Sequence, residues 1–197
     1  MPAFSSFTGS FNAGRRATAV VYLPAAGVSP PQQLVTNSSF DSGTTGWTAS
    51  GGFGSYSISS SSQIAITGGI AYFSYVSRTL SQNVSLTSVI NNANTLTGVV
   101  NIKHREKNDA GTYSQIDTYN FTLVFKNAGG TTITTKTTGT VNAPQNYTDV
   151  TLTLNRSDIP ATFGSIASVD IQVTGLDTGY WNGNWGPMVQ YITLTAS

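Results

Sequence analysis

Hydrophobic and polar residues alternate along several short stretches of this chain. In 117–126 (DTYNFTLVFK), every second residue from Tyr119 to Phe125 is apolar, and 147–154 (YTDVTLTL) shows the same alternation through Val150, Leu152 and Leu154. Because successive side chains of a β-strand point to opposite faces, such stretches indicate strands with one buried face. The same alternation predicts further strands at 64–67, 70–76, 97–105, 132–138, 166–173 and 188–195.

Turn residues separate these predicted strands. Asn127–Gly130 (NAGG) can supply a positive φ and predicts a hairpin. Helix signals are weak: 86–94 could form one short turn, and 157–163 contains a proline and reads as a loop. About nine short strands with frequent turns predict an all-β fold, an antiparallel two-sheet jelly-roll sandwich, over residues 32–197.

Residues 1–31 have a different composition. They are rich in small residues and end in Ser29-Pro30-Pro31, which favours a stiff, extended spacer. A disordered leader is one interpretation, and an extended N-terminal docking arm that orders on a partner is the other. We expect the docking arm, with partner contacts from Phe4, Phe7, Phe11, Arg15 and Arg16.

Charge is scarce, at 9% of residues against roughly 25% in ordinary soluble domains. A net charge of +1 without a basic run argues against nucleic-acid binding. No apolar stretch approaches the roughly 18 residues of a membrane span. The absence of cysteine excludes disulfides and thiolate metal sites. The first residues lack the charged start and apolar core of a classical signal peptide.

The residue inventory also argues against catalysis. The single histidine, His104, is flanked by Lys103 and Arg105, whose charges disfavour the imidazolium of a Ser-His-Asp triad. One Glu and seven Asp form no evident glycosidase pair, and zinc lacks ligands. The segment 103–109 holds five of the seventeen charged residues. We interpret it as a solvated loop or, alternatively, as a polar contact for a ligand or partner.

The most specific motif is 177–187 (DTGYWNGNWGP), which precedes the last predicted strand. It places one tyrosine and two tryptophans beside three glycines, and aromatic rings on a tight loop form flat apolar platforms. Sugar rings stack on such platforms, so the motif indicates carbohydrate binding. Packing against the end of the sandwich is the alternative, and we expect it for Trp185. The candidate carbohydrate-binding residues are Asp177, Tyr180, Trp181 and Asn182.

Two segments resemble a known family. The motif Asp177-x-x-Tyr180-Trp181-x-Gly183-x-Trp185-Gly186-Pro187 is similar to the closing motif of the F-box-associated domain, the sugar-binding module of glycoprotein-recognising F-box proteins. The segment 37–47 (NSSFDSGTTGW) resembles that family's opening, and equally the opening of jelly-roll carbohydrate-binding modules. The resemblance covers about residues 34–195 and implies a galactose-binding-like fold.

The family's sugar contacts carry over only in part. In its sugar-binding members, a tyrosine–tryptophan pair and a following lysine contact the glycan. Tyr180 and Trp181 match that pair, whereas Asn182 stands where the lysine would be. The resemblance therefore implies a stacking surface without its charged donor.

Related jelly rolls also suggest a metal. Asp41 lies where these modules often place a calcium ligand, but Gln190 and Tyr191 replace their acidic pair near the last strand. We therefore expect no cofactor and no metal site, with structural calcium at Asp41 as the alternative. Trp47 is expected to be a core residue.

These observations predict a non-enzymatic virion structural protein, a bacteriophage capsid or tail component whose jelly roll binds host-surface glycans. Its arm would contact other virion proteins, without nucleic-acid or membrane partners. One alternative is a free lectin, cytoplasmic or exported without a classical signal. Another is a capsid decoration or cement protein that binds no sugar. A shallow sugar site of roughly millimolar to micromolar affinity requires several copies, so we expect a homo-oligomer.

Overall fold

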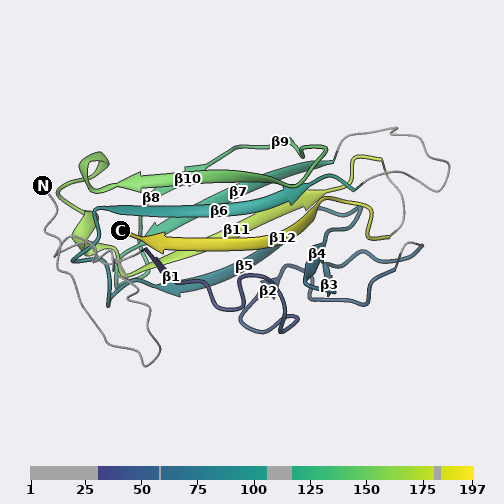
Figure 1. Cartoon of the computed structure of the whole chain (residues 1–197), viewed down its shortest axis with the longest axis horizontal. Helices are drawn as coiled ribbons and strands as arrows, with labels where there is room; N and C mark the ends of the chain where they lie inside the picture. The colour runs from purple at the N-terminus through teal and green to yellow at the C-terminus, as the bar shows by residue number, and fades with distance from the viewer. Residues whose placement is uncertain (1–30, 58, 106–116, 180–182) are drawn as a thin grey trace, which may run out of the picture.

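The computed structural model describes residues 31–57, 59–105, 117–179 and 183–197, which form two packed antiparallel sheets (Figure 1). Sheet A contains β1 (Gln32–Gln33), β3 (Ala65–Thr67), β4 (Ile70–Tyr72), β6 (Thr95–Lys103), β10 (Thr148–Asn155) and β12 (Met188–Ala196). Sheet B contains β2 (Thr48–Ala49), β5 (Arg78–Ser85), β7 (Thr118–Lys126), β8 (Thr132–Thr137), β9 (Val141–Asn142) and β11 (Ser168–Leu176).

The strand order is that of a jelly-roll sandwich, which confirms the predicted fold class. Sheet A runs β10-β6-β12-β4-β3, with β1 beside β12, and sheet B runs β2-β5-β11-β7-β8, with β9 beside β7. The long strands alternate between the sheets along the chain, so each sheet joins segments distant in sequence. In Figure 1, β10, β6 and β12 lie side by side in front of sheet B.

The core lies between the sheets and is built from the predicted alternation. In β7, Phe121, Leu123 and Phe125 are fully buried, and in β10 Leu154 is. Burying such side chains on both inner faces is the main stabilisation of a sandwich. The other hydrophobic strand residues with no exposed surface are Ala71, Leu80, Leu96, Val100, Ile102, Val169, Ile171, Val173, Val189, Ile192 and Leu194.

The sequence prediction missed β5 altogether and extended the strand at 70–76 beyond its end at Tyr72. The polar residue Gln82 occupies an inward position of β5 and is only 7% exposed. Its amide is satisfied by the backbone of Thr36, donating to the carbonyl (3.0 Å) and accepting from the N–H (2.8 Å). Because a buried polar group with partners is stable, the strand tolerates a residue that hides its alternation.

The predicted turns are mostly present. Gly130, at φ 79°, closes the hairpin between β7 and β8, as expected. Residues 86–94 include one helical turn, in which the Ile90 N–H donates to the Leu86 carbonyl (2.9 Å). The segment 157–163, predicted as a loop, begins within one single-turn 3₁₀ helix, η1 (Arg156–Asp158), and ends at the first residue of another, η2 (Phe163–Ser165). Only the residues between these helices form a loop.

The opening motif at 37–47 forms a structural loop. Asn37 adopts φ 50°, and its side-chain amide donates to the carbonyls of Gly43 (2.8 Å) and Thr45 (3.1 Å). Trp47 is 5% exposed, packs against Phe40 and donates its indole N–H to the Asn37 carbonyl (3.0 Å). Trp47 is therefore a core residue, as predicted.

Residues 1–30 lie outside the described part of the chain, so the docking arm and its contacts at Phe4, Phe7, Phe11, Arg15 and Arg16 stay predictions. None of the helices in the described ranges has the length and apolarity that a membrane span requires.

Candidate functional site

The predicted sugar-binding loop is described only at its base. Tyr180, Trp181 and Asn182 lie outside the described residues, so their stacking surface stays a prediction. Asp177 is 5% exposed, and its Oδ1 accepts a hydrogen bond from the Gly179 N–H (2.6 Å). Asp177 therefore shapes the start of this loop from a buried position.

Asn184 ties the end of the same loop to the sandwich. It is fully buried, and its side-chain amide donates to the carbonyl of Gln63 (2.8 Å) and accepts from the N–H of Ser57 (3.0 Å). The next residue, Trp185, is half-buried, and the Arg105 guanidinium lies 4.0 Å from its ring centroid. Trp185 thus makes a cation–π contact at the base of the loop.

A row of outward-facing side chains crosses sheet A at this end. Tyr72 pairs with Met188, and Met188 pairs with Lys103, so β4, β12 and β6 place these residues in line. The Lys103 ammonium lies 4.8 Å from the ring centroid of Tyr147, just before β10. Tyr72 and Met188 alternate with fully buried neighbours, so both side chains point away from the core.

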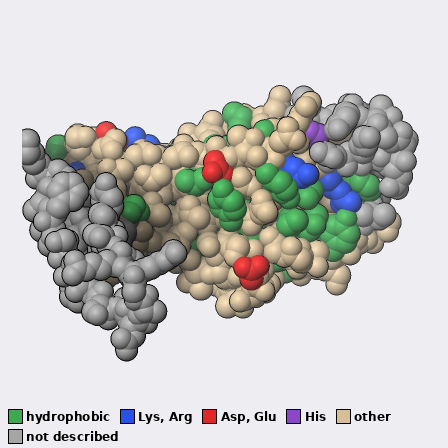
Figure 2. Space-filling view, viewed as in Figure 1, with side chains coloured by type: hydrophobic (Ala, Val, Ile, Leu, Met, Phe, Trp, Pro, Cys, Tyr) green, Lys and Arg blue, Asp and Glu red, His purple; other side chains and the backbone are tan. Residues whose placement is uncertain are grey.

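Tyr56 extends this row beyond the sheet. Its ring, 40% exposed, meets that of Tyr72 edge-on at 4.8 Å, and Arg105 lies 5.3 Å from its centroid. Arg105 is held in place because its Nη1 donates to the Asn184 carbonyl. Figure 2 shows hydrophobic and basic side chains gathered on this face. We call the whole set the aromatic row: Tyr56, Tyr72, Lys103, Arg105, Tyr147, Trp185 and Met188.

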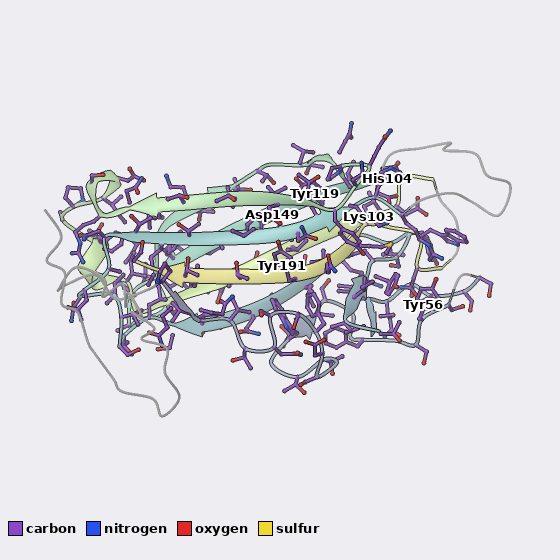
Figure 3. All side chains as sticks on the ribbon, viewed as in Figure 1. Tyr56, Lys103, His104, Tyr119, Asp149 and Tyr191 are labelled. Carbon is purple, nitrogen blue, oxygen red and sulfur yellow. The ribbon has the colours of Figure 1, made fainter. Side chains whose placement is uncertain are left out.

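A polar row lies beside the aromatic row on the same face. Asp149, Asn101 and Tyr191 pair across β10, β6 and β12, and a β-bulge between Val189 and Tyr191 turns Tyr191 outward. Asp149 Oδ1 accepts hydrogen bonds from the Tyr191 hydroxyl (2.5 Å) and the Asn101 amide (2.6 Å). These bonds hold the pKa of Asp149 below its usual value. Figure 3 shows Asp149, Tyr191 and Lys103 over this part of the sheet.

Two polar atoms of this face have no hydrogen-bond partner among the described residues. Asn101 Oδ1 and the Tyr147 hydroxyl are both covered from solvent and unbonded. Burial, followed by the nearby Tyr72 phenol, raises the pKa of Tyr147 to about 12. An unsatisfied buried polar atom costs about 1–3 kcal/mol, so its presence calls for an explanation.

A buried carboxyl group supports Arg105 from below. Asp117 is 4% exposed, and its Oδ2 accepts the Arg105 backbone N–H (3.0 Å). Burial, with a smaller repulsion from Asp177, raises the pKa of Asp117 to about 8, which keeps it mostly protonated at neutral pH. His104, between the two cations of the row, is buried, and its Nδ1 lies 3.0 Å from the Arg105 carbonyl oxygen.

The outer face of sheet B offers a contrasting surface. A groove of about 270 Å³ there contains no aromatic residue in its lining. Asp170 is bonded within it to Asn83 (2.5 Å) and to Lys126 (2.5 Å). The lining residues are Gly46, Thr48, Ser81, Gln82, Asn83, Asp170 and Gln172.

The described residues contain no cluster of three or more His, Cys, Asp or Glu side chains. Asp41, the ligand of the alternative calcium site, is exposed and accepts a hydrogen bond from the Ser39 hydroxyl (2.6 Å). The expectation of no metal site, and the alternative of calcium at Asp41, both stay predictions.

Sequence reasoning found this site only in part. The charged segment at 103–109 was predicted to be a solvated loop or, alternatively, a polar contact for a ligand or partner, and it contributes Lys103 and Arg105. The tyrosines at 56, 72, 147 and 191 were missed. The sequence does contain a signal for Tyr147. Val150, Leu152 and Leu154 occupy the inward-facing positions of the predicted strand 147–154, and Tyr147 occupies one of the alternate positions, which face outward.

Comparison with known proteins gives no family. No family model matches the chain, and neither does any curated protein. The resemblance to the F-box-associated domain therefore stays a prediction.

Among solved structures, the chain is similar to the enzymatically active domain of tailspike protein 4 of bacteriophage CBA120 (11% identity, TM-score 0.47), over 84% of this chain and 21% of that one. It is similar to the CBM22-1 xylan-binding domain of Xyn10C from Paenibacillus barcinonensis (15% identity, TM-score 0.44), over 81% of this chain and 91% of that domain. It is also similar to the CBM2 module of the evolved Dit of Lactobacillus casei BL23 phage J-1 (12% identity, TM-score 0.44), over 85% of this chain and 97% of that module.

Proposed function

We propose that this protein is a non-catalytic carbohydrate-binding domain whose ligand lies on the outer face of sheet A. The observation that carries the proposal is the aromatic row beside the hydrogen-bonded polar row, Asp149, Asn101 and Tyr191. Tyrosine rings with outward faces stack on the C–H faces of sugars, and their hydroxyl edges accept or donate hydrogen bonds.

The scaffold suits such a ligand. Adjacent strands lie about 4.8 Å apart, so a row crossing four strands spans roughly three sugar rings. Tyr72, Lys103 and Met188 of the aromatic row, and all three residues of the polar row, stand on paired strands, which limits the ordering they undergo on binding. The carboxylate of Asp149 already accepts two hydrogen bonds and can accept others from sugar hydroxyls.

A glycan and bacterial-polysaccharide array probed with wild type and three single variants tests the proposal. Tyr72→Ala removes the centre of the aromatic row, Gln172→Ala alters the groove of sheet B, and Trp181→Ala alters the predicted closing-loop platform. We expect Tyr72→Ala to lose binding, because stacking supplies the apolar contact, and Gln172→Ala to keep it.

Circular dichroism and a thermal melt of each variant confirm folding before its array result is interpreted. Loss in Gln172→Ala, or in Trp181→Ala alone, would place the site elsewhere. A folded wild type that binds nothing in its native oligomeric state contradicts a carbohydrate-binding function and favours the decoration-protein alternative.

We further propose that the domain works as a virion component of a bacteriophage, docked through residues 1–31. The sequence supports this through the distinct composition of that segment and a cysteine-free, weakly charged all-β domain. Deleting residues 1–31 separates the alternatives. A particle protein loses incorporation and keeps its fold and glycan binding, whereas a free lectin loses nothing.

A further inference from the structure

We propose that the glycan bound on the sheet A face carries carboxylate groups, as a polysaccharide containing uronic acids does. The inference rests on the proposed carbohydrate-binding function and names the class of ligand for the same site. It follows from the two cations of the aromatic row.

Arg105 is the better placed of the two. Its guanidinium lies against the rings of Trp185 (4.0 Å) and Tyr56 (5.3 Å), and its Nη1 is bonded to the Asn184 carbonyl. Stacking and this bond reduce the side-chain freedom that would otherwise be lost on binding. A guanidinium has five N–H donors in a planar arrangement that matches the two oxygens of a carboxylate. A guanidinium held in one orientation therefore favours an acidic sugar.

Lys103 adds a second cation two residues earlier along the chain. Its ammonium lies 4.8 Å from the Tyr147 ring centroid, and it pairs with Met188 in the line that leads to Tyr72. A sugar stacked on these rings would therefore meet a positive charge at the level of its ring substituents. Two cations within one row fit a polymer whose charge recurs along its length.

Among the residues that the structure describes, the carboxyl groups of Asp117 and Asp149 do not cancel this charge fully. Asp117, which accepts the Arg105 backbone N–H, is mostly protonated at neutral pH because burial raises its pKa. Asp149 belongs to the polar row, where Tyr191 and Asn101 both donate to it. The aromatic row itself contains no carboxylate among its described residues.

The test is calorimetry on the full chain with three uronate polymers, polygalacturonate, alginate and glucuronoxylan, each beside its carboxyl-reduced form. We expect at least one acidic polymer to bind about tenfold more tightly than its reduced counterpart, and less tightly at about 0.5 M salt, because screening weakens charge attraction. Lys103→Gln and Arg105→Gln should each remove most of that preference. Lys136→Gln, which deletes an equal charge on β8 of sheet B, should not.

Lys103→Gln removes the charge and leaves a polar side chain on β6, so it tests the charge even if Arg105→Gln fails to fold. Equal binding of acidic and reduced polymers, or binding of neutral glycans alone on the array, overturns the acidic-ligand inference and leaves the proposed function intact. Absence of binding to every acidic and neutral glycan overturns both. Loss of the preference in Lys136→Gln shows a general effect of net charge and also overturns the inference.

Discussion

The Tyr147 hydroxyl is the clearest residue-level mark of the site. It is covered from solvent and has no hydrogen-bond partner among the described residues. Lys103, which lies over the ring, has a flexible stem that a ligand can displace. The hydroxyl is therefore unfavourable for the free protein and available to a bound sugar.

Tyr147→Phe should separate stability from binding. Deleting an unsatisfied hydroxyl should leave the free energy of unfolding unchanged or raise it by about 1 kcal/mol, and a lost sugar hydrogen bond should weaken binding about fivefold. Urea denaturation and calorimetry measure the two quantities. Tyr119→Phe, in the core of sheet B, is the control for loss of a phenol and should leave affinity unchanged. A destabilised Tyr147→Phe protein with unchanged affinity contradicts this role.

Asp117 gives a second residue-level prediction, on pH. Its pKa is about 8 in the folded chain, against an ordinary value of 3.8 for an aspartate side chain, so the folded protein holds an extra proton between these values. The stability that this proton contributes is complete below about pH 4 and is lost as pH rises through about 8. We expect the unfolding free energy of wild type, relative to Asp117→Asn, to fall between about pH 5 and pH 8.5 in urea titrations. Parallel pH curves for the two proteins would show that Asp117 is not protonated in the fold.

These residue-level features could not be predicted from the sequence, because they depend on which strands pair and in which register. Tyr72, Lys103 and Tyr147 are separated by dozens of residues and come into line only through the register of β4, β12, β6 and β10. The outward position of Tyr191 depends on a bulge that alternation alone does not reveal. By contrast, Trp47, directly before β2, was predictable as core, because a large apolar side chain stabilises a sandwich when it is buried.

At the scale of elements, alternation located strands wherever one face is apolar and the other polar, as in β7 and β10. It failed for β5, where the buried Gln82 satisfies its amide on a loop residue 46 positions away. Such a bond is invisible to local patterning. Fold class was therefore predictable, whereas the full strand set was not.

The packing of β11 against the loop after β4 makes Gly175 essential. A Cβ at this position would lie 2.6 Å from the Phe73 ring and 2.9 Å from Pro187, and neither ring can move without disturbing the core. We expect Gly175→Ala to lower the free energy of unfolding by about 1–3 kcal/mol, the usual cost of overpacking. Chemical denaturation measures the change. Gly164→Ala is the matched control, since nothing lies within 4 Å of its Cβ, and equal effects of the two variants would contradict the packing argument.

For the whole molecule, the two outer faces differ in chemistry. Both faces present a bonded carboxylate and a cation, but sheet A adds a row of aromatic rings, whereas the groove of sheet B, with Asp170 beside Lys126, is lined by no aromatic residue. A ligand should therefore approach from one side only, which leaves sheet B free for contacts with other copies or proteins.

The absence of cysteine makes this sidedness measurable, because one introduced thiol can be labelled uniquely. Thr151 on β10 and Ser85 on β5 are both exposed, the first on sheet A and the second on sheet B. A polyethylene glycol chain attached at Thr151→Cys should abolish glycan binding by covering the two rows, whereas the same chain at Ser85→Cys should leave affinity within about twofold of wild type. Calorimetry before and after labelling provides the comparison, and the unlabelled variants control for the substitutions. Blocking from Ser85 alone would place the ligand on sheet B and overturn the assignment of the site to the sheet A face.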